Sequence, residues 1–385
     1  MSYQYAILGA GRQGYAAAYD LGKHGQAEKI YLADIAPESL NKEATKLNDL
    51  LDSELVEPIL LDIADKSELI KLLEKVDGII SSVHFTYNLE LTKLALEIGF
   101  NMTDLGGNTQ VVRDQLSLNS NQARSTVVPD CGMGPGMNVS LATYAMSLVD
   151  EPREVFIWDG GLPQNPEPPW NYKSTFNLDG LSNEYYGNAY FIQEGDIREV
   201  PCFSKYELLN FPEPLGKLEA FVTSGGLSTA PWSLQHRLKT LENKTLRYPG
   251  HHAQFKAFSD LGLLEQSEVE ISGCKIKPRE FFHHLLKNKI YSPQVEDVGI
   301  IRVLCRGISQ GEPKQARVEL IDYFNPETGL TAMQKLTGWH ASIMLILAVQ
   351  DQLKKGVISV ENAVSGEKIV EQLELRGFNL SVKVK

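Results

Sequence analysis

The stretch from Tyr5 to Gly14, Tyr5-Ala6-Ile7-Leu8-Gly9-Ala10-Gly11-Arg12-Gln13-Gly14, decides the fold of the first third of the chain. Its apolar run predicts a β-strand, and its glycines place the pattern G-x-G-x-x-G between that strand and a helix. Gly9 permits a tight turn, Gly11 lets the backbone approach a pyrophosphate, and Gly14 lets helix and strand pack closely. The helix N-terminus adds unpaired N–H groups for the phosphates. The stretch therefore predicts a dinucleotide-binding βαβ unit; the alternative is a glycine turn in another α/β domain.

An acidic residue follows this unit, because Asp34 lies 20 residues after Gly14 at the end of the second predicted strand. A carboxylate there accepts hydrogen bonds from the adenosine ribose and repels a 2′-phosphate, so we expect NAD rather than NADP. FAD proteins share the glycine pattern, but no further flavin-binding segment is recognisable. Other residues expected to contact the cofactor are Arg12, Gln13, Ile35, Asp62, Ser82, Val83 and Gly106.

Short β-branched runs alternate with amphipathic helical segments over residues 1–149, which predicts a doubly wound parallel sheet of the Rossmann type. The six candidate strands are Tyr3–Leu8, Lys29–Ala33, Glu57–Leu61, Gly78–Val83, Asn101–Leu105 and Thr126–Val128. Residues 150–330 are richer in proline, and their predicted strands lack regular helices between them, so we expect a mixed α+β catalytic domain. Helical spacing returns over residues 331–385, which we expect to pack back on the first domain. The predicted fold class is α/β plus α+β.

Composition excludes several classes of function. The 385 residues include 37 Lys and Arg against 49 Asp and Glu, a net charge of −12. No basic cluster offers a footprint for nucleic acid, no apolar run approaches the roughly 20 residues that span a bilayer, and no signal peptide is recognisable. We therefore expect a cytoplasmic protein. Four scattered cysteines and the adjacent pairs His251-His252 and His283-His284 lack the spacing of a metal site, so no metal is expected.

Polar loops follow the fourth, fifth and sixth predicted strands, whose carboxyl ends meet where ligands bind in such sheets. These segments contain His84 and Tyr87, then Asp104, then Asn138. Oxidation of an amine by hydride transfer needs a proton acceptor, and His84 and Asp104 are the candidates. The structural alternatives are a hydrogen-bonding loop histidine and an aspartate that caps a helix. Cys131 is expected to be a packing thiol rather than a nucleophile.

The chain resembles the saccharopine dehydrogenase superfamily, and within it the L-lysine 6-dehydrogenases. In the first domain the resemblance rests on the glycine pattern, Asp34, Asp104-Leu105-Gly106-Gly107 and the segment Pro129 to Met137. In the second it rests on more diagnostic strings, which are Gly160-Gly161-Leu162-Pro163, Leu178-Asp179-Gly180-Leu181, Thr223-Ser224-Gly225-Gly226 and Arg247-Tyr248-Pro249-Gly250-His251. The chain departs from many members at Trp339-His340, where they have a proline, which bears on substrate preference.

The resemblance implies an NAD-dependent homodimer or higher homo-oligomer that oxidises the side-chain amine of L-lysine. The products would be ammonia, NADH and 2-aminoadipate 6-semialdehyde, which cyclises to piperideine-6-carboxylate. Saccharopine and carboxynorspermidine dehydrogenases share the fold, so reductive coupling of an amine to a semialdehyde is an alternative. A non-catalytic NAD-binding sensor is the alternative from another class.

A lysine site needs a cationic clamp for the carboxylate, and Arg247 is the leading candidate because its planar fork binds carboxylates with two hydrogen bonds. The alternative is an arginine in a structural ion pair. The other candidate substrate contacts are Tyr172, Lys173, Thr223, Ser224 and His251, together with Tyr87 and Asn138.

Overall fold

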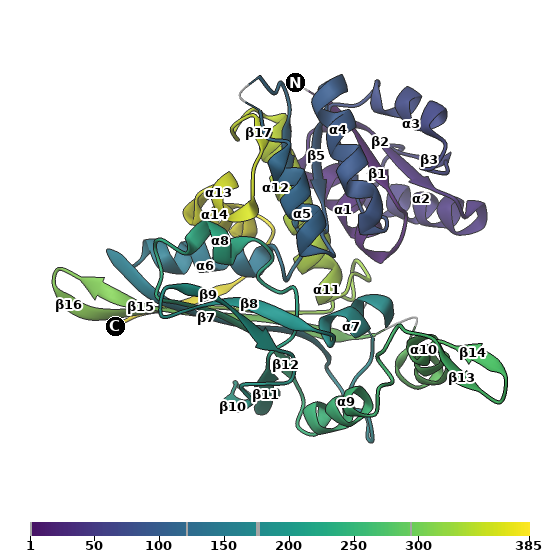
Figure 1. The fold of residues 1–385 in the computed structure, drawn as a ribbon. Helices are drawn as coiled ribbons and strands as arrows, with labels where there is room; N and C mark the ends of the chain where they lie inside the picture. The colour runs from purple at the N-terminus through teal and green to yellow at the C-terminus, as the bar shows by residue number, and fades with distance from the viewer. Residues whose placement is uncertain (1, 121, 175–177, 293–294) are drawn as a thin grey trace.

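The computed structural model describes residues 2–120, 122–174, 178–292 and 295–385. The chain forms two large sheets, the first among helices at the upper right of Figure 1 and the second spread across its lower half. A long cleft runs between them, lined by residues of both. The positions of the two sheets therefore fix the positions of the residues in that cleft.

The first sheet is parallel and has seven strands in the order β17-β6-β5-β4-β1-β2-β3. The strands are β1 (Tyr3–Leu8), β2 (Ala27–Asp34), β3 (Val56–Leu60), β4 (Gly78–Ser81), β5 (Asn101–Asp104), β6 (Thr126–Val128) and β17 (Gly356–Val357). The strand order reverses between β1 and β4, the point at which doubly wound sheets bind their ligands. The predicted Rossmann-type sheet is confirmed, and the tail of the chain adds the seventh strand.

Helices cover both faces of this sheet. They are α1 (Arg12–His24), α2 (Pro37–Leu51), α3 (Lys66–Leu73), α4 (Asn88–Ile98), α5 (Thr109–Ser117) and α12 (His340–Val349), with a 3-10 turn η1 (Phe85–Tyr87) before α4. Neighbouring residues of β1 belong to different apolar clusters, Tyr5 and Ile7 with α1 and α12, and Ala6 and Leu8 with α3 and α4. Strand side chains alternate between faces, so an unbroken apolar run is what a sheet covered on both sides requires.

The second sheet has nine strands, mostly antiparallel, and its main path is β10-β11-β12-β7-β15-β16-β18. Its strands are β7 (Glu151–Pro163), β8 (Asn188–Gln193), β9 (Asp196–Pro201), β10 (Glu207–Asn210), β11 (Lys217–Phe221), β12 (Thr240–Arg247), β15 (Asp297–Ser309), β16 (Glu312–Tyr323) and β18 (Leu380–Val384). One pair, β12 with β7, is parallel, so the sheet is mixed as predicted. Helix α6 (Met137–Ser147) packs on β7, β15 and β16.

Smaller elements complete the second half. They are α7 (Leu178–Glu184), α8 (Ala230–Leu234), α9 (His251–Asp260), α10 (Pro278–Ile290), and the hairpin of β13 (Val269–Ile271) and β14 (Cys274–Ile276). In Figure 1 this hairpin and α10 lie together at the lower right. Among the described residues, no helix is both long and apolar enough to cross a bilayer.

The last part of the chain contacts both sheets. After α11 (Ala332–Gln334), a π-helical turn over Lys335–Trp339 leads into α12, which packs on β4, β5 and α1. Beyond α13 (Val360–Ala363), α14 (Gly366–Glu374) packs on α6, and β18 pairs with β16 of the second sheet. A segment expected to be helical and to pack on the first domain thus also adds a strand to each sheet. The predicted limits of the three domains remain predictions.

Candidate active site

The glycine-rich turn has the geometry that a pyrophosphate requires. Gly9 has a φ of +100°, a conformation that L side chains rarely adopt. A Cβ on Gly14 would lie 2.0 Å from the carbonyl oxygen of Gly9, whereas a Cβ on Gly11 would meet nothing within 4 Å. The space beside Gly11 is therefore open, and α1 begins at Arg12 with no side chain capping its first N–H groups. These N–H groups and the helix dipole suit a dinucleotide's phosphates.

Asp34 lies at the end of β2 and is tied to this turn. Its Oδ2 accepts a hydrogen bond from the N–H of Ala10 at 2.8 Å, and its Oδ1 accepts one from the N–H of Ala36 at 3.0 Å. The carboxylate is thus held in place while remaining partly exposed. Ile35 is 68% exposed, and the exposed Asp62 accepts from the N–H of Ala64 at 2.9 Å. Asp34, Ile35 and Asp62 all lie beyond the lining of the cleft, so their cofactor contacts remain predictions.

The other predicted cofactor residues line the cleft. Ser82 Oγ donates to the carbonyl oxygens of Gly9 at 2.7 Å and of Leu8 at 2.9 Å, which fixes the glycine-rich turn on β4. Val83, Gly106 and Gln13 also face the cleft. Arg12, in contrast, reaches into the second half of the chain, where its Nη2 donates to the carbonyl oxygen of Ser292 at 2.8 Å.

The cleft between the two sheets is a cavity of about 1010 Å³, called here the inner cavity. Its lining includes Gly11 to Gly14, Gly132 to Pro135, Asp159 to Gly161, Thr223 to Gly226, and side chains of α7, β12 and α10. The glycine-rich turn thus opens onto residues from the far sheet. A dinucleotide bound at that turn would extend toward them.

Asp159 lies on the floor of this cavity and was not among the predicted site residues. Only 8% exposed on β7, it accepts hydrogen bonds from Asn138 Nδ2 at 2.6 Å and from Asn243 Nδ2 at 3.1 Å. Burial raises the pKa of Asp159 to about 6, against the lowering effects of these two amides and of Arg247. A carboxylate with a pKa near neutrality is suited to exchange protons at physiological pH.

Asn138 therefore acts through Asp159 rather than on the cavity directly. Its Nδ2 also donates to the carbonyl oxygen of Gly226 at 2.9 Å, and Asn138 does not line either cavity of the cleft. The sequence contained a signal for Asp159 itself, because a single acid in an apolar strand immediately precedes the Gly160-Gly161-Leu162-Pro163 string.

Arg247 lines the cavity but does not present an open fork. Its Nε donates to Tyr185 Oη at 2.9 Å, and its Nη1 donates to Thr245 Oγ1 at 2.6 Å and to the Leu246 carbonyl oxygen at 2.8 Å. Its Nη2 lies 3.3 Å from Glu184 Oε2. Arg247 is therefore the arginine of a structural ion pair, which was the alternative to the carboxylate clamp. It could bind a substrate carboxylate with two hydrogen bonds only if these contacts broke.

Glu184, the partner of Arg247, is a second carboxylate that the sequence did not single out. It lies at the end of α7 and lines the inner cavity. Burial raises its pKa to about 7, although the charge of Arg247 acts to lower it. Asp159, Glu184 and Arg247 thus form a cluster of ionisable groups on the far wall.

Tyr172 and His251 lie behind this cluster and not in the cavity. Both are buried, the guanidinium of Arg247 lies 5.3 Å from the centre of the Tyr172 ring, and His251 Nε2 lies 2.8 Å from Tyr185 Oη. Burial and the neighbouring charge of Arg247 lower the pKa of His251, which stays neutral. Both residues surround Arg247 and line neither cavity, so their predicted substrate contacts stay predictions.

Of the remaining predicted substrate residues, Lys173 and Tyr87 lie away from the inner cavity, whereas Thr223 and Ser224 line it. Lys173 Nζ pairs with Glu167 Oε2 at 2.9 Å, and Tyr87 is an exposed residue of η1 that lines neither cavity. Thr223 and Ser224 line the inner cavity, where Ser224 Oγ donates to the Asn183 carbonyl oxygen at 2.6 Å.

Asp104 does not reach the cavity, which removes the geometric basis for its predicted catalytic role. The carboxylate is fully buried, Oδ1 accepts from the N–H groups of Gly106 at 2.8 Å and Asp130 at 3.1 Å, and Oδ2 accepts from Gln115 Nε2 at 2.8 Å. It joins the loops after β5 and β6 to α5. The correction is that Asp104 shapes the site from behind; it is not a proton acceptor for a substrate.

His84 is exposed at the rim, where its Nδ1 lies 3.0 Å from Thr86 Oγ1. It lines the inner cavity, so its catalytic role stays a prediction.

Asp130 lies deeper, accepts a hydrogen bond from Ser228 Oγ, and has a φ of +60°. Burial and the neighbouring Asp104 raise the pKa of Asp130 well above its usual value. Cys131 is buried, and its Sγ contacts the Val128 carbonyl oxygen at 3.2 Å.

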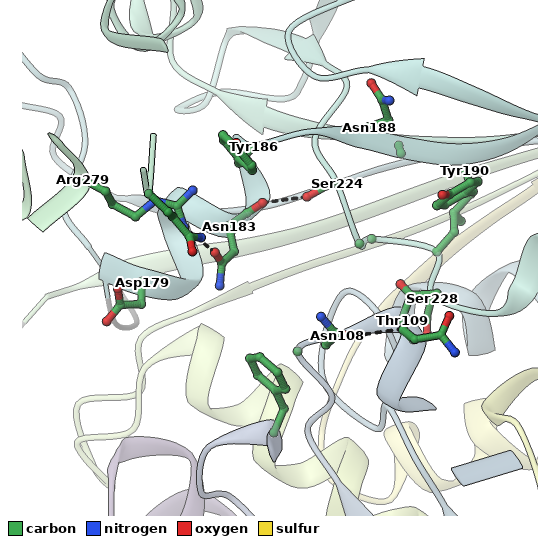
Figure 2. A pocket seen from close by; sticks show the side chains of 18 of the residues that line it. Asn108, Thr109, Asp179, Asn183, Tyr186, Asn188, Tyr190, Ser224, Ser228 and Arg279 are labelled. Carbon is green, nitrogen blue, oxygen red and sulfur yellow. Dashed lines mark hydrogen bonds between the residues drawn. The ribbon is translucent and has the colours of Figure 1, made fainter. Parts of the chain in front are cut away.

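A second cavity of about 890 Å³, called here the outer cavity, shares a wall with the first. Figure 2 shows side chains of α7, Asn183 among them, and the tyrosines Tyr186 and Tyr190 around it. Arg279 is 6% exposed there and donates from Nη1 to Asn183 Oδ1 at 2.7 Å. Among the described residues, no group of three His, Cys, Asp or Glu side chains is arranged to hold a metal ion.

A glycine-rich turn at a switch point, facing ionisable groups of a second domain across a cleft, defines a two-domain nicotinamide-dinucleotide oxidoreductase. Comparison with known families agrees. The model of the saccharopine dehydrogenase NADP binding domain matches residues 5–128, and that of the saccharopine dehydrogenase C-terminal domain matches residues 132–378. The chain belongs to the saccharopine dehydrogenase family.

Curated relatives include two fungal proteins named saccharopine dehydrogenase [NADP(+), L-glutamate-forming]. That of Saccharomyces cerevisiae is 27% identical over 250 residues, which are 61% of this chain and 54% of that protein. That of Pyricularia oryzae is 24% identical over 251 residues, which are 62% of this chain and 54% of that protein. The matches thus span about half the length of these relatives.

A solved structure shares the fold. The apo saccharopine dehydrogenase (L-Glu forming) of Saccharomyces cerevisiae superposes with a TM-score of 0.77 at 19% identity, covering 100% of each chain. The likeness establishes the arrangement of the two sheets.

Proposed function

We propose that this chain oxidises the side-chain amine of L-lysine with NAD, releasing ammonia and 2-aminoadipate 6-semialdehyde. The observation that supports this most is Asp159, a buried carboxylate with a pKa of about 6 on the floor of the cleft. The bound nicotinamide would accept the hydride from the carbon next to the nitrogen. Water then replaces nitrogen on the oxidised carbon, and the balanced products are the aldehyde, ammonium, NADH and a proton.

Asp159 would take the proton that the distal ammonium must lose before oxidation. Asn138 and Asn243 hold both of its oxygens, which fixes the orientation of the carboxylate, and no ion pair joins it to another of the described residues. Its raised pKa makes it a stronger base than an exposed aspartate while leaving it ionised above pH 6. Thr223 and Ser224 lie on the same wall and supply hydrogen bonds for orientation.

The charge of the inner cavity favours a substrate with two ammonium groups. Its lining contains five Asp and Glu side chains, Asp130, Asp159, Asp179, Glu184 and Glu280, against three Arg and Lys side chains, Arg12, Arg247 and Lys287. Burial raises the pKa of Asp130 well above its usual value and that of Glu184 to about 7, so these two acids contribute less negative charge than the other three. Both arginines are already hydrogen-bonded to other groups of the chain. Lysine has two amines and one carboxylate, which suits such a wall better than a substrate with several carboxylates.

NAD is the proposed cofactor, although the family model and the fungal relatives bear names that include NADP. Asp34 stands at the position that meets the adenosine ribose, and the next residues, Ile35, Ala36 and Pro37, include no cation that could hold a 2′-phosphate. A fixed carboxylate there disfavours NADP.

Reductive coupling, as in saccharopine or carboxynorspermidine formation, is the second candidate. The outer cavity supports it, because a second substrate of amino-acid size would need such a space, with Arg279 and Lys277 on its wall. The relatives' names support the saccharopine variant.

A substrate panel tests the two candidates. Purified protein with NAD and L-lysine, L-ornithine, diamines or saccharopine would be followed by NADH absorbance, with NADP in parallel. We expect NADH from lysine alone. Activity with saccharopine and none with lysine would replace the proposal by the coupling reaction.

A further inference from the structure

Helix α10 of the second domain forms one wall of the inner cavity. Glu280, His284, Lys287 and Tyr291 all line that cavity. Their spacing of four, three and four residues places them on one face of the helix and its extension. The sequence reasoning assigned none of these four residues a function. One face of a second-domain helix is thus turned toward the cleft.

The C-terminal end of this helix lies against the glycine-rich turn. The guanidinium carbon of Arg12 is 5.7 Å from the centre of the Tyr291 ring, and Arg12 Nη2 donates to the Ser292 carbonyl oxygen at 2.8 Å. Lys287 precedes Tyr291 by four residues, about 6 Å along a helix axis. Glu280, two turns earlier, lines both the inner and the outer cavity, whereas Lys287 lines the inner cavity alone. Lys287 is therefore on the cofactor side of the wall.

The glycine-rich turn offers backbone N–H groups to a pyrophosphate, and the Lys and Arg side chains among the described residues of the cavity lining are Arg12, Arg247 and Lys287. Arg12 is engaged with Ser292 and Tyr291. Lys287 is exposed, and no ion pair or hydrogen bond joins its side chain to another of the described residues. A flexible ammonium at the mouth of a phosphate site is a common anion partner.

We propose that Lys287 binds the pyrophosphate of the dinucleotide from the second domain, so that the cofactor bridges both domains across the cleft. The inference rests on the dinucleotide assignment and not on lysine as the substrate. Binding of the cofactor would then hold α10 against the glycine-rich turn, next to the contact that Arg12 already makes.

NADH titration without substrate tests the contact. The fluorescence of NADH would be followed with wild-type protein, Lys287→Gln, Lys287→Arg and Lys289→Gln; Lys289 is an exposed lysine of the same helix that lines neither cavity. We expect Lys287→Gln to raise the Kd for NADH about tenfold, the size of one lost charge-assisted hydrogen bond. Lys287→Arg should stay near wild type and Lys289→Gln should equal it. ADP-ribose, which retains the pyrophosphate, should lose affinity to the same extent.

Equal NADH affinity in Lys287→Gln and Lys289→Gln would overturn the proposal. An unchanged Kd for NADH in Lys287→Gln, together with a raised KM for the amino-acid substrate, would also overturn the proposal. Lys287 would then bind a carboxylate of the substrate. Thermal melting of each variant ensures that only folded protein is compared. Because the NADH and ADP-ribose titrations contain no substrate, failure of lysine turnover leaves their result unaffected, and the two proposals can fail separately.

Discussion

Asn138 Nδ2 donates a 2.6 Å hydrogen bond to Asp159 Oδ2, joining the start of α6 to the middle of β7. Asn138 lies two residues after Gly136 on α6, which packs on β7, β15 and β16 of the second sheet, and Asp159 lies in the lining of the inner cavity. The orientation of the carboxylate therefore depends on how α6 packs on β7. Asn243 on β12 holds the other oxygen at 3.1 Å.

Replacing Asp159 by Asn should lower kcat with lysine about a hundredfold or more, because the proton acceptor is lost. The Kd for NADH should stay within twofold, since Asp159 does not contribute to the glycine-rich turn. Steady-state kinetics and NADH titration measure the two quantities. The exposed Asp196→Asn on β9 serves as the matched control, and equal kcat in both variants would exclude Asp159 as the base.

The activity should depend on pH through Asp159. Burial raises its pKa to about 6, so the carboxylate is protonated below that pH and cannot accept a proton from the substrate. We expect kcat/KM to rise as pH increases through about 6. In Asp159→Asn, kcat/KM should not rise through about pH 6. A rise that persists in this variant would belong to the titration of another group.

Asp34→Asn should reduce the preference for NAD. The Asn oxygen can still accept from the Ala10 N–H, so the glycine-rich turn should keep its shape, while the negative charge and the hydrogen bond from the Ala36 N–H are lost. We expect the ratio of NADPH to NADH dissociation constants to fall about tenfold, as the repulsion of the 2′-phosphate disappears. Fluorescence titrations with both nucleotides measure it, and an unchanged ratio would remove Asp34 as the discriminating residue.

Arg247→Met should destabilise the protein as well as impair activity. The change leaves the buried Tyr185, and Glu184 with its side chain 32% exposed, without their partner, which should cost about 1 to 3 kcal/mol. Urea unfolding gives the difference. Arg198→Met, at an exposed ion pair, should cost less than about 1 kcal/mol. Similar losses in the two variants would contradict the buried network.

Asp104→Asn separates a structural role from a catalytic one. Asn can still accept from the Gly106 and Asp130 N–H groups, but its amide would face the Gln115 amide donor. We expect a stability loss of about 1 to 3 kcal/mol with kcat within twofold of wild type. A large fall in kcat at unchanged stability would restore Asp104 as a catalytic residue.

Local patterns were sufficient to predict the first sheet. Gly9, Gly14 and Asp34 act on neighbours within one βαβ unit, and the alternation of Ala6 and Ile7 between faces follows from strand geometry. The seventh strand, β17, escaped prediction because two residues near the end of the chain carry no recognisable periodicity.

The candidate site was harder to predict because its chemistry depends on contacts between distant segments. Asp104 is held by the N–H of Asp130 and by Gln115, and Arg247 by Tyr185 and Glu184, partners that no local pattern identifies. Sequence patterns favour polar residues near the ends of strands, such as His84 and Asp104, as catalytic groups. The proposed base, Asp159, instead lies inside β7, where a sequence pattern predicts only burial.

The reaction of ε-¹⁵N-labelled L-lysine with NAD tests the central claim most directly. NMR would follow labelled ammonium while absorbance follows NADH. The account predicts one ¹⁵N-ammonium for each NADH, with Asp159→Asn slow in both. NADH without labelled ammonium, or no reaction with lysine while saccharopine is oxidised, would contradict it.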